Sequence, residues 1–238
     1  MRLIVSLATL LLALTACAAP KLDDYVQNDI KDFKLTAKAV KANQDELMKI
    51  SKDFALGYRM LKGSATVQYK EPGRVRMEGT VAGVKMLFVL KDNKKLSAVP
   101  VWHIRDVEDI THSPGKRTTS LDFGFITPGL LQIANAKYIR KESNGNFVFD
   151  VTWKDPEDSS RHRVWVNPDT RIIEKREWYR QSGRMMATFN YSGAVKVSKE
   201  IYMPSKVEIY NTEGKLAGET TQSNFAVNYG APDSLFTW

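Results

Sequence analysis

The chain has 238 residues, which is enough for one large domain or two small ones. Hydrophobic residues make up 43% and charged residues 26%, which argues against a disordered or fibrous protein. There are 35 Lys and Arg residues against 27 Asp and Glu residues, so the formal net charge is +8. A single cysteine excludes an intramolecular disulfide and a cysteine-built zinc cluster, and 3 histidines leave little for a histidine-built metal site.

The first residues indicate an export signal. A basic start at Met1-Arg2 precedes an apolar run over 3–14, which has the length of a signal-peptide core and is too short to span a bilayer. The run ends in Leu14-Thr15-Ala16-Cys17. This sequence resembles the lipobox of bacterial lipoproteins, in which the cysteine is acylated and becomes the first mature residue. We therefore predict a lipoprotein signal peptide over 1–16 and lipidation of Cys17; a chance cysteine beside an ordinary cleavage site is the alternative.

Lipidation would place the mature domain at a membrane. Each buried lipid methylene contributes about 0.8 kcal/mol and one acyl chain anchors only marginally, so a multiply acylated Cys17 would anchor stably. No later stretch reaches about 18 consecutive apolar residues, so no transmembrane helix is predicted. Residue 18 is Ala and not Asp, and Asp there resembles an inner-membrane retention signal of lipoproteins. We expect the periplasmic face of the outer membrane, with the inner membrane as the alternative.

The start of the mature chain has two interpretations. We assign 17–22 to a lipidated tether. Apolar residues then recur at helical spacing and predict an amphipathic helix over 23–51, with Asp23 or Asp24 as its cap. The alternative is a strand at Phe33–Val40, because apolar residues also alternate there.

From Phe54 onward the apolar period is two, which predicts strands. Turn residues such as Asp92-Asn93 and Asn144-Gly145 separate them, as in antiparallel sheets or barrels. A short helix is expected at Thr127–Ile133, with Pro128 in its first turn. We predict a single domain over 23–238, and its strands run over 54–61, 64–71, 74–80, 84–91, 95–104, 136–142, 146–154, 161–167, 171–180, 184–191, 205–211 and 215–227.

No catalytic or metal-binding motif emerges from the sequence. The histidines are scattered, and neither a nucleophile elbow nor a phosphate-binding loop is present. Two acidic clusters, 106–109 and 155–158, could bind a cation or supply an acid–base pair, but we favour a solvated loop and a hairpin tip as their explanation. We therefore predict a protein that is not an enzyme and uses no metal or cofactor. The export signal argues against nucleic acid as a partner, and the basic excess suits anionic lipid headgroups.

The apolar residues of the strands are more informative. Methionine and bulky aromatic side chains suit an adaptable cavity for flexible chains, although a packed core would use the same residues. If sheet and helix enclose a cavity, these are the residues expected to line it: Met77, Met86, Phe88, Phe149, Trp153, Trp165, Trp178 and Met186.

Several segments in order resemble one known superfamily. They are a strand ending in residues 67–72, the next strand from Arg74, the strand and turn at 164–170, and residues 228–236 near the end. Together they resemble the LolA/LolB-like superfamily, whose members include outer-membrane lipoprotein-sorting proteins. The resemblance implies an incomplete antiparallel β-barrel, or strongly curved sheet, capped by an N-terminal helix and a short internal helix. It further implies a mainly β (α+β) fold whose cavity takes the acyl chains of lipoproteins.

Two positions bear on the role within that superfamily. Soluble carriers have an Arg before the strand-ending proline, which helps to latch the closed cavity, and here that position is Glu71. The anchored receptor has an apolar residue projecting from a loop, and Val81 is the nearest match here, with an ordinary hairpin tip as the alternative. The anchor makes this chain look more like the receptor than the carriers.

The sequence thus predicts a membrane-anchored periplasmic protein that binds lipid or lipoprotein acyl chains and takes part in outer-membrane lipoprotein sorting. Its expected partners are acyl chains, the membrane through its anchor, and an envelope protein. The alternative is an envelope sensor or assembly module that uses the same fold without transport, as RseB-like stress sensors do. An enzyme acting on envelope lipid or glycan would require Asp106, Glu108 and His103 to converge in one cleft.

Overall fold

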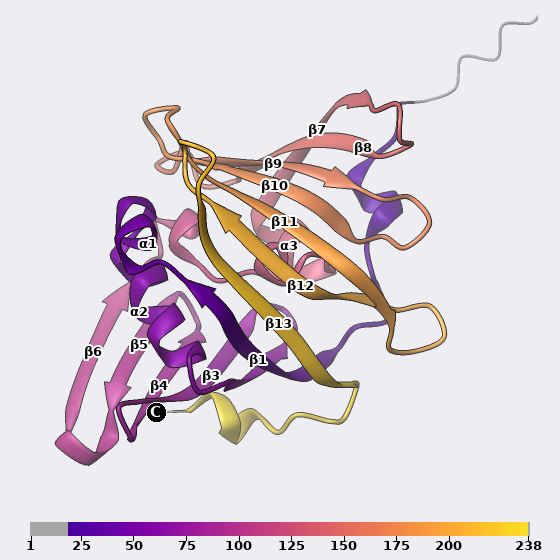
Figure 1. Cartoon of the computed structure of the whole chain (residues 1–238). Helices are drawn as coiled ribbons and strands as arrows, with labels where there is room; N and C mark the ends of the chain where they lie inside the picture. Colours follow the sequence, from indigo (N-terminus) through magenta and orange to yellow (C-terminus); the bar gives the residue numbers. More distant parts are fainter. Residues whose placement is uncertain (1–18, 238) are drawn as a thin grey trace, which may run out of the picture.

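A single curved antiparallel sheet dominates the structure, a computed structural model that describes residues 19–237. The sheet has 13 strands in the order β6-β5-β4-β3-β2-β1-β13-β12-β11-β10-β9-β8-β7. Its two edge strands, β6 and β7, do not pair with each other, so the sheet bends around without closing (Figure 1). The predicted mainly β class, with an incomplete antiparallel barrel, is confirmed.

Short helices lie between several of the strands along the chain. The α-helices and the five short 3-10 helices are α1 Gln44–Ile50, α2 Lys52–Leu61, α3 Pro128–Ile133, η1 Leu22–Tyr25, η2 Pro100–Trp102, η3 Pro114–Lys116, η4 Ser120–Phe123 and η5 Asp233–Phe236. The strands are β1 Asp32–Ala42, β2 Ala65–Lys70, β3 Arg74–Val81, β4 Val84–Lys91, β5 Lys94–Val99, β6 Ile104–Asp109, β7 Ala134–Lys141, β8 Phe147–Trp153, β9 Arg161–Val166, β10 Ile173–Tyr179, β11 Met185–Lys196, β12 Tyr202–Tyr210 and β13 Leu216–Val227.

The helix predicted over 23–51 is wrong, and the alternative strand at 33–40 is confirmed as part of β1. Strand β1 lies in the middle of the sheet, where Phe33 pairs with Tyr69 of β2 and with Val227 of β13. Its alternate residues Phe33 and Leu35 are buried. The local apolar spacing was compatible with both the helical and the strand period. Pairing with residues far along the chain, such as Val227, decides for the strand.

Helices α1 and α2 follow β1 directly, and α2 replaces the strand that was predicted over 54–61. The side chain of Asn43 accepts a hydrogen bond from the amide of Glu46 and so caps α1. The side chain of Ser51 caps α2 in the same way, through the amide of Asp53. Helix α1 lies within the range that was predicted to be helical, whereas α2 lies where the sequence pattern predicted a strand.

The strand predicted over 95–104 ends earlier than expected. Strand β5 stops at Val99, the chain turns through η2, and β6 returns antiparallel to β5 as the edge of the sheet. Strand β6 contains the acidic cluster 106–109, which had been assigned to a loop or a site. Edge strands commonly carry charges, which discourage pairing with another chain.

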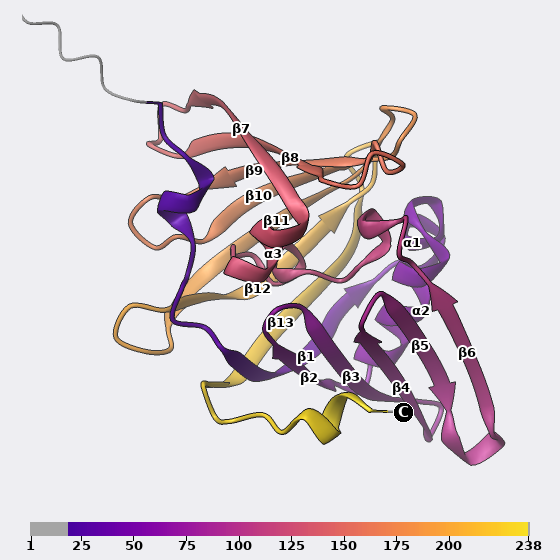
Figure 2. The same ribbon diagram turned by 180° about the vertical axis from the view of Figure 1, so that it is seen from behind.

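Alternating side chains give the sheet a concave and a convex face. The concave face carries two apolar clusters. The first cluster spans β8 to β13 with α1 and α2, and includes Phe149, Val164 and Phe189. The second cluster is centred on β1 to β4, and includes Phe33 and Tyr69. The α3 helix lies in the hollow of the sheet (Figure 2).

The C-terminal residues cover the convex face of β3 to β5. Phe236 of η5 is fully buried in a third cluster with Val89 and Leu96. Arg76 donates a hydrogen bond to the carbonyl of Leu235, at 2.8 Å. The end of the chain is therefore an integral part of the fold.

We expect Phe236→Ala to lower the free energy of unfolding by about 3–5 kcal/mol, because it leaves a cavity in this third cluster. Chemical denaturation followed by circular dichroism measures the change. Ser234→Ala, at an exposed position of the same helix, serves as the control and should be close to neutral. An equal loss in the two variants would contradict a packing role for Phe236.

Candidate functional site

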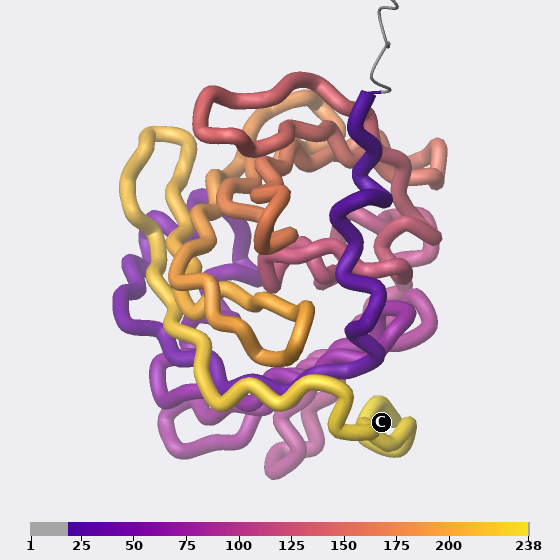
Figure 3. The backbone as a smooth tube through the Cα atoms, turned by 90° about the vertical axis from the view of Figure 1, so that its right-hand side faces the viewer, coloured from indigo at the N-terminus to yellow at the C-terminus, as the bar shows by residue number. Residues whose placement is uncertain are grey.

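Residues 110–133, which we call the inner segment, cover the concave face together with helices α1 and α2. The inner segment contains η3, η4 and α3, and it crosses the space that the curved sheet encloses (Figure 3). Its apolar side chains join both concave clusters, and these are Leu121, Ile126 and Leu130 in the first and Ile110, Phe123 and Phe125 in the second. The hollow of the sheet is therefore occupied by the protein's own apolar residues.

Polar contacts fasten the inner segment to the sheet and to the N-terminal residues. Among the backbone carbonyls that accept hydrogen bonds are those of Leu121 from the Tyr191 hydroxyl at 2.7 Å, Gly124 from the Ile173 amide at 2.8 Å, and Ile126 from the Gln27 amide at 2.9 Å. These bonds fix the position of the segment along the strands. Apolar contacts alone would not fix it, because they are non-directional.

Glu71 joins the turn between β2 and β3 to the start of α3. One carboxylate oxygen accepts a hydrogen bond from the Gly129 amide at 2.7 Å, and the other accepts one from the Tyr69 hydroxyl. The Thr127 hydroxyl lies 3.2 Å from the same Tyr69 oxygen. Burial, and next the charge of Glu71, raise the pKa of the Tyr69 hydroxyl well above its usual value, so this hydroxyl remains a donor. The carboxylate of Glu71 therefore links strand β2 to helix α3.

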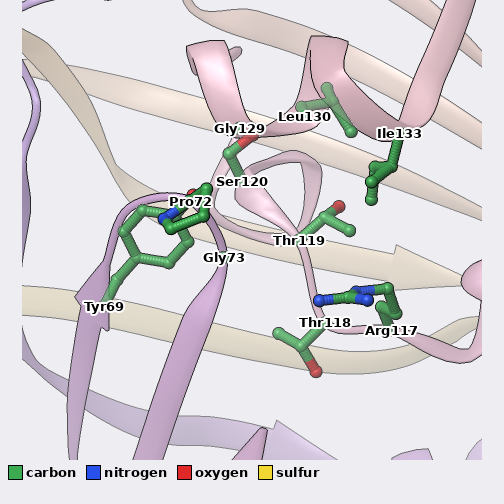
Figure 4. Close-up of a pocket in the computed structure, with 10 residues that line it drawn as sticks. All are labelled: Tyr69, Pro72, Gly73, Arg117, Thr118, Thr119, Ser120, Gly129, Leu130 and Ile133. Carbon is green, nitrogen blue, oxygen red and sulfur yellow. The ribbon is translucent and has the colours of Figure 1, made fainter. Parts of the chain in front are cut away.

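A small pocket lies beside this contact, between the β2–β3 turn and the inner segment (Figure 4). Its volume is about 10 Å³, which is room for one water molecule. It is lined by Tyr69, Pro72, Gly73, Arg117, Thr118, Thr119, Ser120, Gly129, Leu130 and Ile133. The pocket therefore lies at the contact between the inner segment and the sheet.

A buried ion pair also joins the inner segment to the sheet. Arg176 on β10 donates to Asp122 of η4 at 2.7 Å, and the Arg176 side chain is only 3% exposed. Burial alone lowers the pKa of Arg176, but the Asp122 carboxylate outweighs it and the pKa is raised. Nearby, burial and then the Arg176 charge lower the pKa of His162 well below its usual value. His162 is therefore neutral at pH 7.

The residues predicted to line a cavity fall into separate groups. Met77 and Phe88 are a cross-strand pair on the concave face, and Met86 lies next to them opposite Gly79. All three are half-buried. Phe149 and Trp153 of β8 are buried in the first cluster, Trp178 packs against that cluster, and Met186 is buried.

Trp165 does not lie on the concave face with these residues. Its neighbours Val164 and Val166 face the first cluster, so the Trp165 side chain points to the convex face. There its indole nitrogen donates to Glu142 at 3.0 Å, and Lys175 lies 4.3 Å from its ring centroid. The sequence pattern did not separate the two faces, because β9 is apolar at three successive positions.

The loop predicted to contact a membrane or partner is a tight hairpin turn. Val81 pairs with Val84 across it and is half-buried. Helix η2 contacts β4 beside this turn and carries a more exposed apolar tip. Val101 is 66% exposed and Trp102 is 61% exposed. Sequence reasoning missed this tip, because the residues were assigned to the interior of one long strand.

The acidic clusters take part in separate surface contacts. Glu108 pairs with Lys95 and Lys116, whereas His103 lies at the turn before β6, so Asp106, Glu108 and His103 do not converge. Asp155 lies 3.3 Å from the exposed His112. Across residues 19–237, no three acidic, histidine or cysteine side chains are grouped as a metal site would require.

The predicted signal peptide and Cys17 lie outside the described residues. Leu22, assigned to the tether, is buried in the first cluster, so the folded part includes it. None of the helices within 19–237 has the length and apolar character needed to cross a membrane.

We expect Gly129→Ala to loosen the inner segment, because its methyl group would collide with the Pro72 carbonyl and the Glu71 carboxylate. Amide hydrogen exchange over 127–133 should quicken, and the free energy of unfolding should fall. Gly57→Ala, in the open on helix α2, is the matched control and should gain about 0.5–1 kcal/mol. Unchanged exchange in Gly129→Ala would show that the close approach is not needed.

The comparisons with solved structures concern the fold. An outer membrane lipoprotein-sorting protein domain from Vibrio parahaemolyticus matches with a TM-score of 0.59 at 12% identity, covering 91% of this chain and 93% of that one. A LolA superfamily protein from Nitrosomonas europaea matches with a TM-score of 0.61 at 14% identity, covering 91% and 94%. A DUF1329 family protein from Desulfovibrio piger matches with a TM-score of 0.59 at 15% identity, covering 91% and 92%.

No protein-family model and no curated protein matches the sequence. The structural likeness extends over nearly the whole of the described chain and of the proteins it matches. The expected resemblance therefore holds at the level of architecture, and the chain has the LolA-like fold.

Proposed function

We propose that this protein binds the acyl chains of lipids or lipoproteins between its sheet and its inner segment, and that it takes part in outer-membrane lipoprotein sorting. The supporting observation is the inner segment itself. It fills an apolar hollow in an unclosed sheet, and hydrogen bonds and the buried Arg176–Asp122 ion pair fasten it. Such a cover can be exchanged for another apolar occupant.

The exchange needs little net free energy. Displacing the inner segment exposes apolar surface on the sheet, which costs about 25 cal/mol per Å² until another apolar group covers it. An acyl chain restores about 0.8 kcal/mol for each buried methylene. Because apolar contacts are non-directional, the sheet accepts either occupant. Binding and release of this kind involve no covalent step, so the proposed activity calls for no cofactor.

The half-buried group on β3 and β4 is the proposed point of entry. Met77, Met86 and Phe88 retain contact with solvent while their strand neighbour Leu90 is fully buried in the second cluster. Methionine adapts to irregular partners because its side chain is unbranched and flexible. An acyl chain that begins to bind here would continue inward as the inner segment withdraws.

The proposed anchor is a lipidated Cys17 in the periplasmic leaflet of the outer membrane. It rests on the lipobox-like sequence 14–17 and on Ala18. The N-terminal end of the described ribbon lies at the upper right of Figure 1, near β7 and β8, and the β5–β6 hairpin lies at the lower left. An anchor at the N-terminal end would leave the Val81 turn and the Trp102 tip free, and we propose that this end meets an envelope protein partner.

The lipid-binding proposal predicts that residues 18–238, which contain all of the described fold, bind a diacylated lipopeptide. Phe88→Asp should lower the affinity at least about tenfold, because its carboxylate would lie against the acyl chain. Fluorescence titration with a labelled lipopeptide measures the affinity.

The matched control is Thr152→Asp, which adds the same charge at an exposed position on β8. Its neighbours Val151 and Trp153 face the first cluster, so residue 152 points to the convex face. The control should bind as the unmodified protein does. A correctly folded protein that takes up no lipopeptide would refute the proposed function.

The anchoring proposal predicts that Cys17→Ser abolishes labelling by radioactive palmitate in bacteria that process lipoproteins. The variant should also leave the membrane fraction, because no acyl chain remains to hold it there. Ser6→Ala, within the predicted signal peptide, is a control that should label normally. Palmitate incorporation into Cys17→Ser would contradict the assignment of the anchor.

A further inference from the structure

Arg176 is a buried cation in an otherwise apolar hollow. It lies on the concave face of β10, with its guanidinium carbon 3.9 Å from the centroid of the Phe189 ring. Removing such a charge from water costs several kcal/mol unless a partner compensates it. The compensating carboxylate comes from the inner segment, through Asp122 at 2.7 Å. The charge balance of the hollow therefore depends on a part of the chain that the proposed function requires to move.

Asp122 differs from its partner in its access to water. Its side chain is 26% exposed, against 3% for Arg176. Its second oxygen accepts a hydrogen bond from the Thr119 amide, within the same segment. The carboxylate thus lies at the margin of the hollow, and it leaves together with η4 when the inner segment withdraws.

Three buried nitrogens next to this ion pair have no hydrogen-bond partner. They are Nε of Arg176, Nδ1 of His162 and Nε1 of Trp178. His162 and Trp178 are directly opposite on β9 and β10, which puts their β-carbons about 5 Å apart. Arg176 lies two residues before Trp178 on β10 and on the same face, about 7 Å from it. Nε of Arg176 and Nε1 of Trp178 carry hydrogens, and neutral His162 donates from Nδ1 in the tautomer that has its proton there. Unpartnered buried donors are costly, so this grouping favours a ligand that accepts hydrogen bonds.

From these contacts we infer that Arg176, His162 and Trp178 form the site for the anionic headgroup of an amphiphile, and that Asp122 occupies this site in the absence of ligand. The inference rests on the proposed function, because the acyl chain of the same amphiphile would lie against the concave clusters. An oxyanion replaces the Asp122 carboxylate at Arg176 and also accepts from Nε of Arg176 and Nε1 of Trp178, and from Nδ1 of His162 when that atom carries the ring proton. A fatty-acid carboxylate and a phospholipid phosphate share this chemistry.

The geometry also predicts selectivity among ligands with the same chain. Without an anionic head, a ligand that displaces Asp122 leaves Arg176 buried without a counter-charge. An alcohol of equal chain length should therefore bind more weakly than the acid. Because His162 is neutral, Arg176 supplies the positive charge of this group, and one negative charge on the ligand suffices.

The test compares palmitate, hexadecanol and a C16 lysophosphatidic acid as ligands of residues 18–238, measured by isothermal titration calorimetry. We expect both anionic ligands to bind at least about tenfold more tightly than the alcohol, since a charge-assisted hydrogen bond is worth roughly that factor. Tighter binding of palmitate would assign the site to carboxylates, and tighter binding of lysophosphatidic acid would assign it to phosphates.

The decisive variant is Asp122→Asn, which keeps the size of the side chain and removes its charge. It should raise the affinity for all three ligands to the same degree, about tenfold, because each of them displaces the side chain of residue 122 from Arg176. Asp150→Asn is the matched control. Asp150 forms an ion pair with Arg163, with 2.7 Å between the charged atoms, and this pair does not belong to the concave clusters. The control should leave the affinity for each of the three ligands unchanged. Arg176→Lys, which keeps the charge without the planar fork, should weaken only the anionic ligands.

The outcomes separate this inference from the proposed function. Equal binding of acid and alcohol, with no effect of Asp122→Asn, would overturn the headgroup site while leaving acyl-chain binding intact. Failure of all three ligands and of the lipopeptide to bind would overturn both. If Arg176→Lys does not fold, the comparison of acid with alcohol tests the headgroup site, and the comparison of Asp122→Asn with Asp150→Asn tests the displacement of Asp122.

Discussion

An unclosed, curved sheet has an apolar concave face that must be covered, and the rest of this structure depends on that constraint. Leaving such a face in water costs about 25 cal/mol per Å². A closed barrel would bury it by wrapping around itself, but β6 and β7 stay apart here. The chain supplies the cover from two places, the α1–α2 pair after β1 and the inner segment between β6 and β7. The proposed acyl-chain site is the surface beneath the second of these covers.

The two kinds of contact under the inner segment have different physical roles. Leu121, Phe123 and Phe125 pack into the two apolar clusters, and an acyl chain can replace this packing because apolar contacts have no direction. The polar contacts of Glu71 and Asp122 set the register and can be replaced only by groups of matching chemistry. A hollow of this construction would accept many chains but discriminate among headgroups. The proposed function and the headgroup site are thus two consequences of one arrangement.

The strands from β2 onward were predictable in most cases because their pattern is local. Alternation of apolar residues and turn pairs such as Asp92-Asn93 needs no knowledge of distant residues. The interpretation failed at β1, whose central position depends on pairing with β13 almost two hundred residues later. It also failed at Trp165, because an uninterrupted apolar run does not reveal which face a residue takes. Met77, Met86 and Phe88 follow the local alternation and share the concave face, and their role in lining a cavity stays a prediction.

By itself the sequence determined the mainly β class, the short helix at α3 and the candidate anchor at Cys17, since each depends on residues close together in the chain. The tertiary structure alone decided what fills the hollow. Asp122 and Arg176 are 54 residues apart, and nothing in either local pattern indicates that they meet. Their pairing follows from the path of the inner segment across the concave face. That path is set by burial and by hydrogen bonds to strands on both sides, which are long-range interactions that a local pattern cannot encode.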